Sequence, residues 1–258
     1  MISRVNKTSA NNGPVLEFSQ VIRSYPGEPR VIAVDSVSFA LPRGAFAAVL
    51  GPSGSGKTTL LNLASGLDHA DSGKIIIAGR TVSELDQAAL CAFRRQHLGF
   101  VFQAYNLFPV LSAVENVEFT SAIRGDTSAD ARARAVEALT LVGLGHKLHA
   151  RPNQLSGGQQ QRVAVARALA SQPDIIFADE PTANLDSKTA LSLIELFEKL
   201  NADLGVTFFF STHDQKLADR VKTRIEMCDG KISGAPEAAD SARIAPGMSG
   251  KDSLVSAH

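Results

Sequence analysis

The run GPSGSGKTT at residues 51–59 constrains the fold of this chain more than any other feature of its sequence. It fits the pattern G-x-x-x-x-G-K-[ST]. The nearly continuous apolar run AFAAVL (45–50) comes directly before it, and LLNLAS, a plausible helix, comes directly after it. This strand–loop–helix context predicts a phosphate-binding loop in an α/β fold and argues against a chance glycine-rich turn. The fixed positions are Gly51, Gly56, Lys57 and Thr58.

The chemistry of the loop follows from its residue types. Glycines let the backbone curl so that successive N–H groups point at phosphate oxygens, and the dipole of the following helix adds positive potential. We expect Lys57 to bridge the β- and γ-phosphates of a nucleotide and the Thr58 hydroxyl to ligate Mg²⁺. The expected phosphate-binding residues are Gly51, Pro52, Ser53, Gly54, Ser55, Gly56, Lys57, Thr58 and Thr59.

The segment IIFADE at residues 175–180 supplies two carboxylates. Its apolar residues predict a strand, which places Asp179 at the carboxyl end, where α/β sheets bind ligands. We expect Asp179 to hold Mg²⁺ through water, and Glu180 to orient and polarise an attacking water molecule. The phosphate loop alone is compatible with small GTPases, nucleotide kinases, helicases and transport ATPases. The carboxylate pair reduces this set of candidate classes.

Apolar segments with strand composition alternate with helical segments along the chain. Two of them, 175–179 and 206–211, are short and mostly apolar, as in a parallel sheet covered on both faces. Between them, large apolar side chains recur at threes, which predicts a helix that Asp186 or Ser187 caps and Gly205 ends. Further strands are predicted at 15–21, 37–41, 45–50, 74–79 and 98–103, and a further helix at 128–143.

Charge and composition exclude several functional classes for this chain. The 258 residues carry 26 Lys plus Arg and 26 Asp plus Glu, which argues against a nucleic-acid partner bound through a basic field. No run reaches the roughly 18 apolar residues that would cross a bilayer, so we expect a cytoplasmic chain without a direct membrane span. Cys91 and Cys228 are expected to be free thiols. Residues 1–14 and 234–258 are expected to be flexible tails around one folded unit, 15–233.

The string LSGGQ at residues 155–159, followed by QQRVAVARAL, adds a second glycine-rich segment before a helix. Its N–H groups can form a second anion site. With the phosphate loop and the strand ending in Asp-Glu, the chain resembles the ATP-binding cassette (ABC) family over residues 15–233. The resemblance implies an α/β P-loop NTPase with a RecA-like core, an antiparallel β subdomain and an α-helical signature subdomain at about 104–172.

The resemblance also implies a head-to-tail dimer that binds ATP and Mg²⁺. In this arrangement, the phosphate loop of one subunit and the LSGGQ segment of a second copy enclose each nucleotide. Asp186, in TANLD (182–186), would face the opposite subunit. The nucleotide contacts implied across the dimer are Ser156, Gly157, Gly158, Gln159 and Asp186.

Other motif positions carry over residue by residue. Gln103, at the end of LGFVFQ, is implied to contact Mg²⁺ and the attacking water, and His213, in STHD, is implied to contact the γ-phosphate. Tyr25 resembles the aromatic residue that stacks on adenine, the alternative being a tyrosine that packs in a turn beside Pro26. The implied catalytic residues are Lys57, Gln103, Glu180 and His213. The implied metal ligands are Thr58, Gln103 and Asp179.

The segment AYNLFPVLSAVENV (104–117) resembles the part of the family that receives a coupling helix from a membrane partner. For Leu107, Phe108 and Leu111 the alternative is plain core packing. The strings RPNQLSGGQQQRVAVARAL and DIIFADEPTANLD resemble the branch that contains the lipoprotein-releasing and macrolide-exporter ATPases. This branch implies a separate integral membrane permease as partner and a peripheral location on the inner face of the cell membrane.

Two functions stay open on this resemblance. In the first, ATP hydrolysis drives export or extraction of a lipid, lipoprotein, peptide or drug. In the second, the chain is the ATPase motor of a mechanotransmission complex that regulates an envelope enzyme, of the cell-division type, without transport. The soluble DNA-repair and translation members carry a long coiled-coil insertion or two cassettes. Only 52 positions separate Gln103 from Leu155, which leaves no room for such an insertion.

Overall fold

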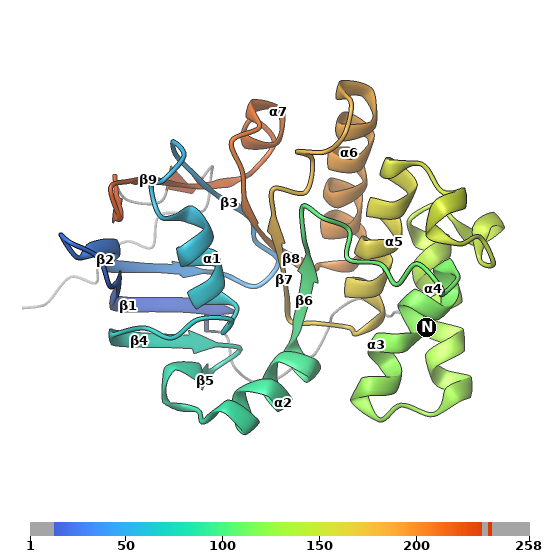
Figure 1. Ribbon diagram of the computed structural model, residues 1–258, viewed down its shortest axis with the longest axis horizontal. Helices are drawn as coiled ribbons and strands as arrows, with labels where there is room; N and C mark the ends of the chain where they lie inside the picture. Colours follow the sequence, from blue (N-terminus) through green and yellow to red (C-terminus); the bar gives the residue numbers. More distant parts are fainter. Residues whose placement is uncertain (1–12, 234–236, 239–258) are drawn as a thin grey trace, which may run out of the picture.

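The computed structural model describes residues 13–233 and 237–238. A four-stranded sheet lies at one end, a seven-stranded sheet in the middle and a block of helices at the other end (Figure 1). This arrangement confirms the predicted α/β fold with its core, its antiparallel subdomain and its helical part. The helical block consists of α3 (Ala113–Arg124), α4 (Ser128–Leu141) and α5 (Gly157–Ala170).

The small sheet is antiparallel throughout. Its strands are β1 (Leu16–Tyr25), β2 (Val31–Leu41), β4 (Ser72–Ile77) and β5 (Arg80–Thr81), in the order β2-β1-β4-β5. The alternation predicted within residues 37–41 is confirmed, because Val37, Phe39 and Leu41 are all buried. Phe39 stacks on Phe18 of the neighbouring strand, with ring centroids 4.8 Å apart. The apolar face of this sheet therefore packs inward.

The central sheet runs in the order β10-β9-β3-β8-β7-β6, with β11 also pairing with β9. Its strands are β3 (Phe46–Leu50), β6 (Leu98–Val101), β7 (Ile175–Asp179), β8 (Thr207–Ser211), β9 (Thr223–Cys228), β10 (Lys231–Ile232) and β11 (Glu237–Ala238). The five longer strands pair in parallel. Successive side chains of a strand point to opposite faces, yet Phe208, Phe209 and Phe210 are all 0% exposed. Both faces of the sheet are therefore covered, as predicted.

Further helices lie outside the helical block, and one of them follows its local signals closely. The remaining ones are α1 (Lys57–Ala64), α2 (Gln87–His97), α6 (Ser187–Leu204) and α7 (Gln215–Ala218), with short 3-10 turns at Val82–Glu84, Gly145–Lys147 and Pro152–Gln154. The predicted cap of α6 is confirmed, because the Asp186 carboxylate accepts from the N–H groups of Lys188 and Thr189. Gly205 then ends α6 in the left-handed region, at φ 69°. The helix predicted at 128–143 is α4.

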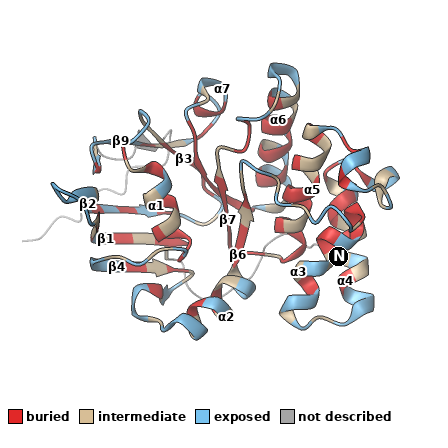
Figure 2. Ribbon diagram, in the orientation of Figure 1, coloured by how far each residue is buried: buried red, intermediate tan, exposed pale blue. Residues whose placement is uncertain are grey.

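Buried side chains form two clusters, one on each side of the central sheet (Figure 2). One cluster fills the space between the small sheet, α1 and the central strands. The other joins the central strands to α5 and α6, where the ring of Phe197 lies 5.3 Å from both Phe208 and Phe210. The central sheet thus contributes side chains to both cores, and the loops at its carboxyl edge follow strands that are packed on both faces.

The two ends of the chain differ from the expected tails in one respect. β11 lies in the segment 234–258, and it pairs with β9 through two backbone positions, Glu237 with Arg224 and Ala238 with Thr223. Such pairing needs no apolar side chain, so composition did not predict it. The remainder of the two expected tails, apart from residues 13–14, lies outside the described residues. Within the described ranges, no helix has the length and apolar character needed to cross a membrane.

Candidate functional site

The phosphate loop connects the end of β3 to the start of α1, and its glycines are required by close packing. Gly51 has φ 150° and Gly56 has φ 101°, in the region that favours glycine. A Cβ on Gly56 would lie 2.1 Å from the carbonyl oxygen of Ala33, and one on Gly51 would lie 2.1 Å from that of Met227. The loop is therefore wedged between β2 and β9, and no other residue fits at these two positions.

Lys57, the first residue of α1, turns back over its own loop. Its Nζ donates to the carbonyl oxygens of Gly51 and Pro52, both at 2.8 Å. The side chain is only 8% exposed, so the charge is held in place rather than free in solvent. An ammonium group has three donors, and two are used here. The third is available for a phosphate oxygen.

An open cleft of ≈ 850 Å³ lies over the phosphate loop. This volume is within the range of pockets that bind small molecules and cofactors. Apolar side chains of β2, Val31 and Ile32, line one part of it, which suits a nucleotide base. The structure brings these predicted residues together along its walls: Tyr25, Gly51, Pro52, Ser53, Gly54, Gly56, Lys57, Thr58, Thr59, Gln103, Glu180 and His213. Ser55 belongs to the same loop but is buried beneath it.

Glu180 follows β7 with a strained backbone, at φ 46°. A non-glycine residue in this region is uncommon, and such strain is typical of functional sites. One carboxylate oxygen, Oε1, lies 2.7 Å from Nδ1 of His213. The other oxygen accepts from the hydroxyl of Thr212 at 3.3 Å and from the N–H of His213 at 3.4 Å. The end of β8 therefore holds the carboxylate in a fixed position beside the cleft.

Asp179 is the last residue of β7, next to Glu180. Its Oδ1 is buried and has no hydrogen-bond partner among the described residues. Burial, the largest influence, raises the pKa of the Asp179 carboxyl; the Ser211 hydroxyl and the charge of Lys57 oppose this, and the charge of Glu180 adds to it. A buried acceptor oxygen without a partner fits a divalent cation, which would supply both the missing contact and the opposite charge. Thr58 and Gln103 line the cleft, whereas Asp179 is not among the residues described along it and adjoins it through Glu180. The oxygen donors of the predicted ligand set are of the kind that Mg²⁺ prefers.

The LSGGQ segment begins α5, as predicted, but it lies apart from the phosphate loop. Ser156 caps the helix: its hydroxyl accepts from the N–H of Gln159, whose side chain accepts in return from the N–H of Ser156. In Figure 1, α5 and α1 lie on opposite sides of the central strands. The residues described along the cleft do not include Ser156, Gly157, Gly158, Gln159 or Asp186. These predicted contacts therefore lie away from the cleft of their own chain.

Two residues of α5 that the sequence analysis did not single out hold the loop around Gln103. Gln161 is 0% exposed, and its Nε2 donates to the carbonyl oxygens of Phe102 at 3.3 Å and Pro181 at 2.9 Å. Arg167 donates to the carbonyl oxygens of Tyr105 and Asn106. A signal existed for Gln161, because it lies at helical spacing from the buried Gly158 and Ala164, where an apolar residue is expected.

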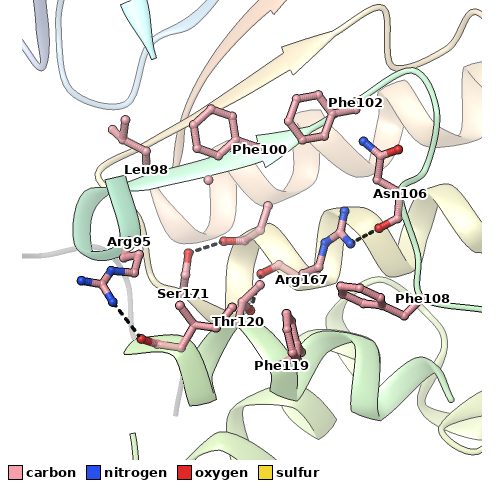
Figure 3. A pocket seen from close by; sticks show the side chains of 13 residues that line it. Arg95, Leu98, Phe100, Phe102, Asn106, Phe108, Phe119, Thr120, Arg167 and Ser171 are labelled. Atoms are coloured by element: carbon pink, nitrogen blue, oxygen red, sulfur yellow. Dashed lines mark hydrogen bonds between the residues drawn. The ribbon is translucent and has the colours of Figure 1, made fainter. Parts of the chain in front are cut away.

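A second cavity, an apolar groove of ≈ 310 Å³, is lined by residues of β6, α3 and α5. Phe108 and Phe119 lie at its rim, 43% and 41% exposed, with ring centroids 4.8 Å apart (Figure 3). Leu107 instead packs against the core. Core packing, the alternative for this segment, therefore holds for the partly buried Leu107, whereas Phe108 is exposed. The groove is lined by Arg95, Leu98, Gly99, Phe100, Phe102, Asn106, Phe108, Phe119, Thr120, Ile123, Arg167, Ala168 and Ser171.

Comparison with known sequences agrees with this geometry. The sequence profile of the ABC transporter family matches residues 34–183, more than half of the chain. The macrolide export ATP-binding/permease protein MacB of Burkholderia pseudomallei is 45% identical over 241 residues, which cover 92% of this chain and 37% of that protein. The lipoprotein-releasing system ATP-binding protein LolD of Alcanivorax borkumensis is 43% identical over 223 residues, which cover 86% of this chain and 98% of that protein.

The chain spans 37% of the length of the macrolide export protein, so the likeness concerns its ATP-binding part. Among solved structures, a dimeric ATP-binding cassette in a post-hydrolysis state, bound to ADP and Pi, has a TM-score of 0.79 and 39% identity. The likeness covers 88% of this chain and 100% of that chain. These relatives come from the two groups that the motif strings predicted. Since the profile match includes both the phosphate loop and LSGGQ, the chain belongs to the ABC transporter family as one of its ATP-binding cassettes.

Proposed function

We propose that this chain hydrolyses ATP as the nucleotide-binding subunit of a transporter, in a head-to-tail dimer that acts on a membrane permease. The observation that carries the proposal is the separation of the two glycine-rich helix starts. The phosphate loop lines the cleft, whereas the LSGGQ segment caps a helix elsewhere on the surface. A second copy, turned by a two-fold axis, would bring its Ser156 and Asp186 to each cleft.

In the proposed reaction, the residues of the cleft bind the nucleotide and orient and polarise the attacking water. The loop N–H groups and the third donor of Lys57 hold the β- and γ-phosphates, and Tyr25 stacks on adenine. Mg²⁺, held through Thr58, Gln103 and Asp179, would neutralise charge on the phosphates when bound. Glu180 orients the attacking water, and closure of the dimer excludes bulk solvent.

His213 has a defined part in this scheme, because it already contacts the proposed general base. The ring lies against Glu180 in the single chain, at 2.7 Å. A nucleotide in the cleft offers the ring an alternative acceptor, the γ-phosphate. We infer that His213 exchanges one partner for the other, which releases the carboxylate toward water only when nucleotide is bound.

The apolar groove is the proposed docking site for the permease. Phe108, Phe119 and Ile123 are exposed there, which is unusual for large apolar side chains unless a partner covers them. The loop that carries Phe108 follows Gln103 directly, and Arg167 ties it to α5. Movement of a docked segment would thus reach both the metal-binding glutamine and the signature helix. The location that follows is the inner face of the cell membrane, beside the permease.

The work proposed for this machine is export or extraction of a lipid, lipoprotein, peptide or drug. The names of the relatives support this class, since one is named for macrolide export and one for lipoprotein release. The alternative motor that only transmits force would use the same cleft and dimer. Transport assays with the reconstituted permease distinguish the two, because the motor predicts ATP turnover without movement of any compound.

The dimer is tested with two substitutions. Glu180→Gln keeps the size of the side chain but removes the base. Unhydrolysed ATP should therefore stay bound between the subunits and hold the dimer together, as measured by sedimentation with and without ATP. Adding Ser156→Arg should abolish the ATP-dependent dimer and leave ATP binding to the monomer intact. Ser128→Arg, a matched change at the exposed start of α4, should leave the dimer unaffected. A dimer that survives Ser156→Arg contradicts the proposal.

A further inference from the structure

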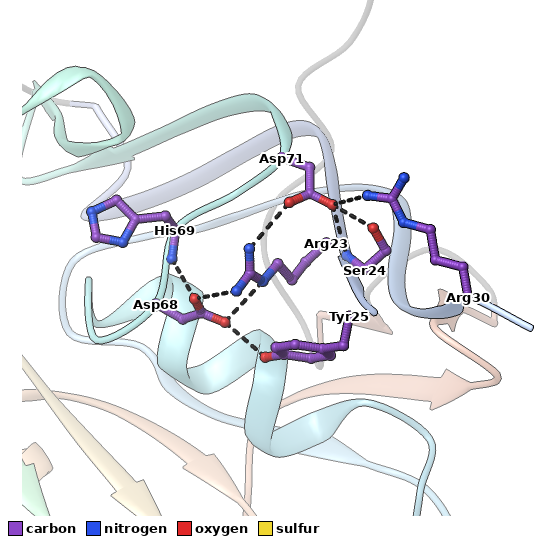
Figure 4. Close-up of polar contacts among 7 residues, drawn as sticks. All are labelled: Arg23, Ser24, Tyr25, Arg30, Asp68, His69 and Asp71. Atoms are coloured by element: carbon purple, nitrogen blue, oxygen red, sulfur yellow. Dashed lines mark hydrogen bonds and ion pairs between the residues drawn. The ribbon is translucent and has the colours of Figure 1, made fainter. Parts of the chain in front are cut away.

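A polar cluster lies at the base end of the cleft, behind Tyr25 (Figure 4). It joins the end of β1 to the loop between α1 and β4, two segments more than 40 positions apart in the chain. We call it the base-platform cluster; its members are Arg23, Ser24, Tyr25, Arg30, Asp68, His69 and Asp71. Tyr25 lines the nucleotide cleft, whereas Asp68 is absent from the residues described along it.

Tyr25 is fixed in the cluster by two contacts. Its hydroxyl donates to Oδ2 of Asp68 at 2.7 Å. The guanidinium carbon of Arg23 lies 4.7 Å from the centroid of the tyrosine ring, so the cation covers one ring face. These contacts restrict both torsions of the tyrosine side chain, and they leave the face turned away from Arg23 for a ligand.

Asp68 holds Arg23 as well. Its two oxygens receive a forked contact from the guanidinium, Nε to Oδ2 at 3.0 Å and Nη2 to Oδ1 at 2.8 Å. Paired geometry of this kind fixes orientation as well as distance. The remaining end of the guanidinium donates to Asp71 at 3.1 Å. Both contacts that restrain Tyr25 therefore converge on one carboxylate, that of Asp68.

We propose that Asp68 is a positioning residue for the nucleotide base: through its bonds to Tyr25 and Arg23, it holds the tyrosine ring so that one face meets the base. The inference rests on the proposed stacking of Tyr25 on adenine and extends it. Asp68 follows α1, the helix that begins with the phosphate loop. The cluster thus ties the platform for the base to the element that binds the phosphates, and it fixes the distance between the two ends of one nucleotide.

A stacking platform recognises the flat face of a base and tolerates any base. Loss of positioning should therefore weaken the binding of ATP and GTP by the same factor. It should not weaken the binding of inorganic tripolyphosphate, which carries the phosphates and no base. This contrast separates a role at the base from a general disturbance of the site.

The test compares four proteins by calorimetric titration with ATP, GTP and tripolyphosphate. Asp68→Asn should bind both nucleotides about tenfold more weakly than the wild type, the order of one stacking contact, with tripolyphosphate unchanged. Tyr25→Phe breaks the same bond from the other side and should lose about two- to fivefold in nucleotide affinity. Arg30→Ala is the matched control, because Arg30 is exposed and pairs with Asp71, at 3.3 Å, rather than with Tyr25 or Asp68. It should bind all three ligands as the wild type does.

Steady-state kinetics add a second readout. Asp68→Asn should raise the KM for ATP and leave kcat at saturating ATP unchanged, because the reacting groups stay in place. Unchanged ATP affinity in Asp68→Asn and Tyr25→Phe, or an equal loss for ATP and tripolyphosphate, would overturn the inference. Tyr25→Ala separates this failure from failure of the proposed stacking: if Tyr25→Ala also binds ATP normally, the adenine platform itself is wrong.

Discussion

Nδ1 of His213 lies 2.7 Å from Oε1 of Glu180, so the residue proposed to sense the γ-phosphate contacts the residue proposed to activate water. The contact bridges β7 and β8, two neighbouring parallel strands whose carboxyl ends meet at the cleft. The backbone of Glu180 is strained and its second oxygen is bound to Thr212 and to the His213 N–H. The carboxylate is therefore fixed at the cleft by three contacts. Of these, the contact with the His213 ring is the one that we expect a nucleotide to replace.

Replacing His213 by Ala should reduce kcat by roughly a hundredfold, because the γ-phosphate loses a donor and Glu180 loses its orienting contact. ATP affinity should fall by less than about tenfold, since one hydrogen bond among many is lost. His146→Ala, in an exposed 3-10 turn, is the control and should turn over ATP normally. A His213→Ala protein with the wild-type kcat would show that the contact between His213 and Glu180 is structural.

Lys57→Ala should weaken binding itself. The substitution removes the charge at the phosphate loop, and charge-assisted contacts of this kind are worth about 1.5–3 kcal/mol, or roughly ten- to a hundredfold in affinity. The carbonyl groups of Gly51 and Pro52 lose their donor at the same time, but they lie at an open cleft where water replaces it. Titration with ATP measures the effect, and Lys74→Ala, on the exposed edge of β4, is the control. Equal affinities in the two variants would refute the proposed phosphate contact.

The elements that the sequence predicted correctly are those specified by short-range signals. The phosphate loop carries its glycines within nine residues, and α6 carries a cap, an apolar stripe and a terminal glycine within twenty. The helix α2 went unpredicted because it buries two side chains, Leu90 and Phe93, within a mostly polar segment. The strand β11 went unpredicted because backbone pairing alone forms it.

The candidate site divides in the same way. The resemblance to the family predicted Gln103 and His213, and the strand ending in Asp-Glu predicted Glu180; the structure places all three along one cleft. Asp68 could not be assigned to Tyr25, because the two are 43 positions apart and no local pattern links the end of one strand to a distant loop. Contacts of this kind depend on how the small sheet packs against α1, and this packing cannot be predicted from the sequence pattern.

Asp179→Asn separates stability from function. Folding raises the pKa of this carboxyl, chiefly through burial, so the ionised form is less favourable in the folded chain than in the unfolded chain. Stability from this group is complete below the unfolded pKa, near 4, and is lost as the pH rises through the folded pKa. The nucleotide-free Asn variant should therefore melt at a higher temperature than the wild type at pH 7, with the difference vanishing toward pH 4. Mg²⁺ with ATP should stabilise the wild type more than the variant. A lower melting temperature for the variant at pH 7 would contradict the burial argument.

Gln161 and Gln160 offer a matched pair on one helix, because each side-chain amide donates to two backbone carbonyls. Gln161 bonds to Phe102 and Pro181, which adjoin the proposed metal ligand Gln103 and the proposed base Glu180. Gln160 bonds to Pro152 and Leu155, away from the cleft. Replacing either by Leu should cost about 1–3 kcal/mol of unfolding free energy, measured by denaturant titration, since two carbonyls lose a donor.

Activity should distinguish the two substitutions. Gln161→Leu releases the two catalytic segments from the signature helix, so kcat should fall by roughly ten- to a hundredfold, as expected when reacting groups shift by about an ångström. Gln160→Leu should keep the wild-type kcat at a temperature where both variants are folded. Equal kcat values in the two variants would mean that α5 stabilises the fold without positioning Gln103 and Glu180. A fall confined to Gln161→Leu would identify its buried amide as the link between the signature helix and the chemistry of the neighbouring cleft.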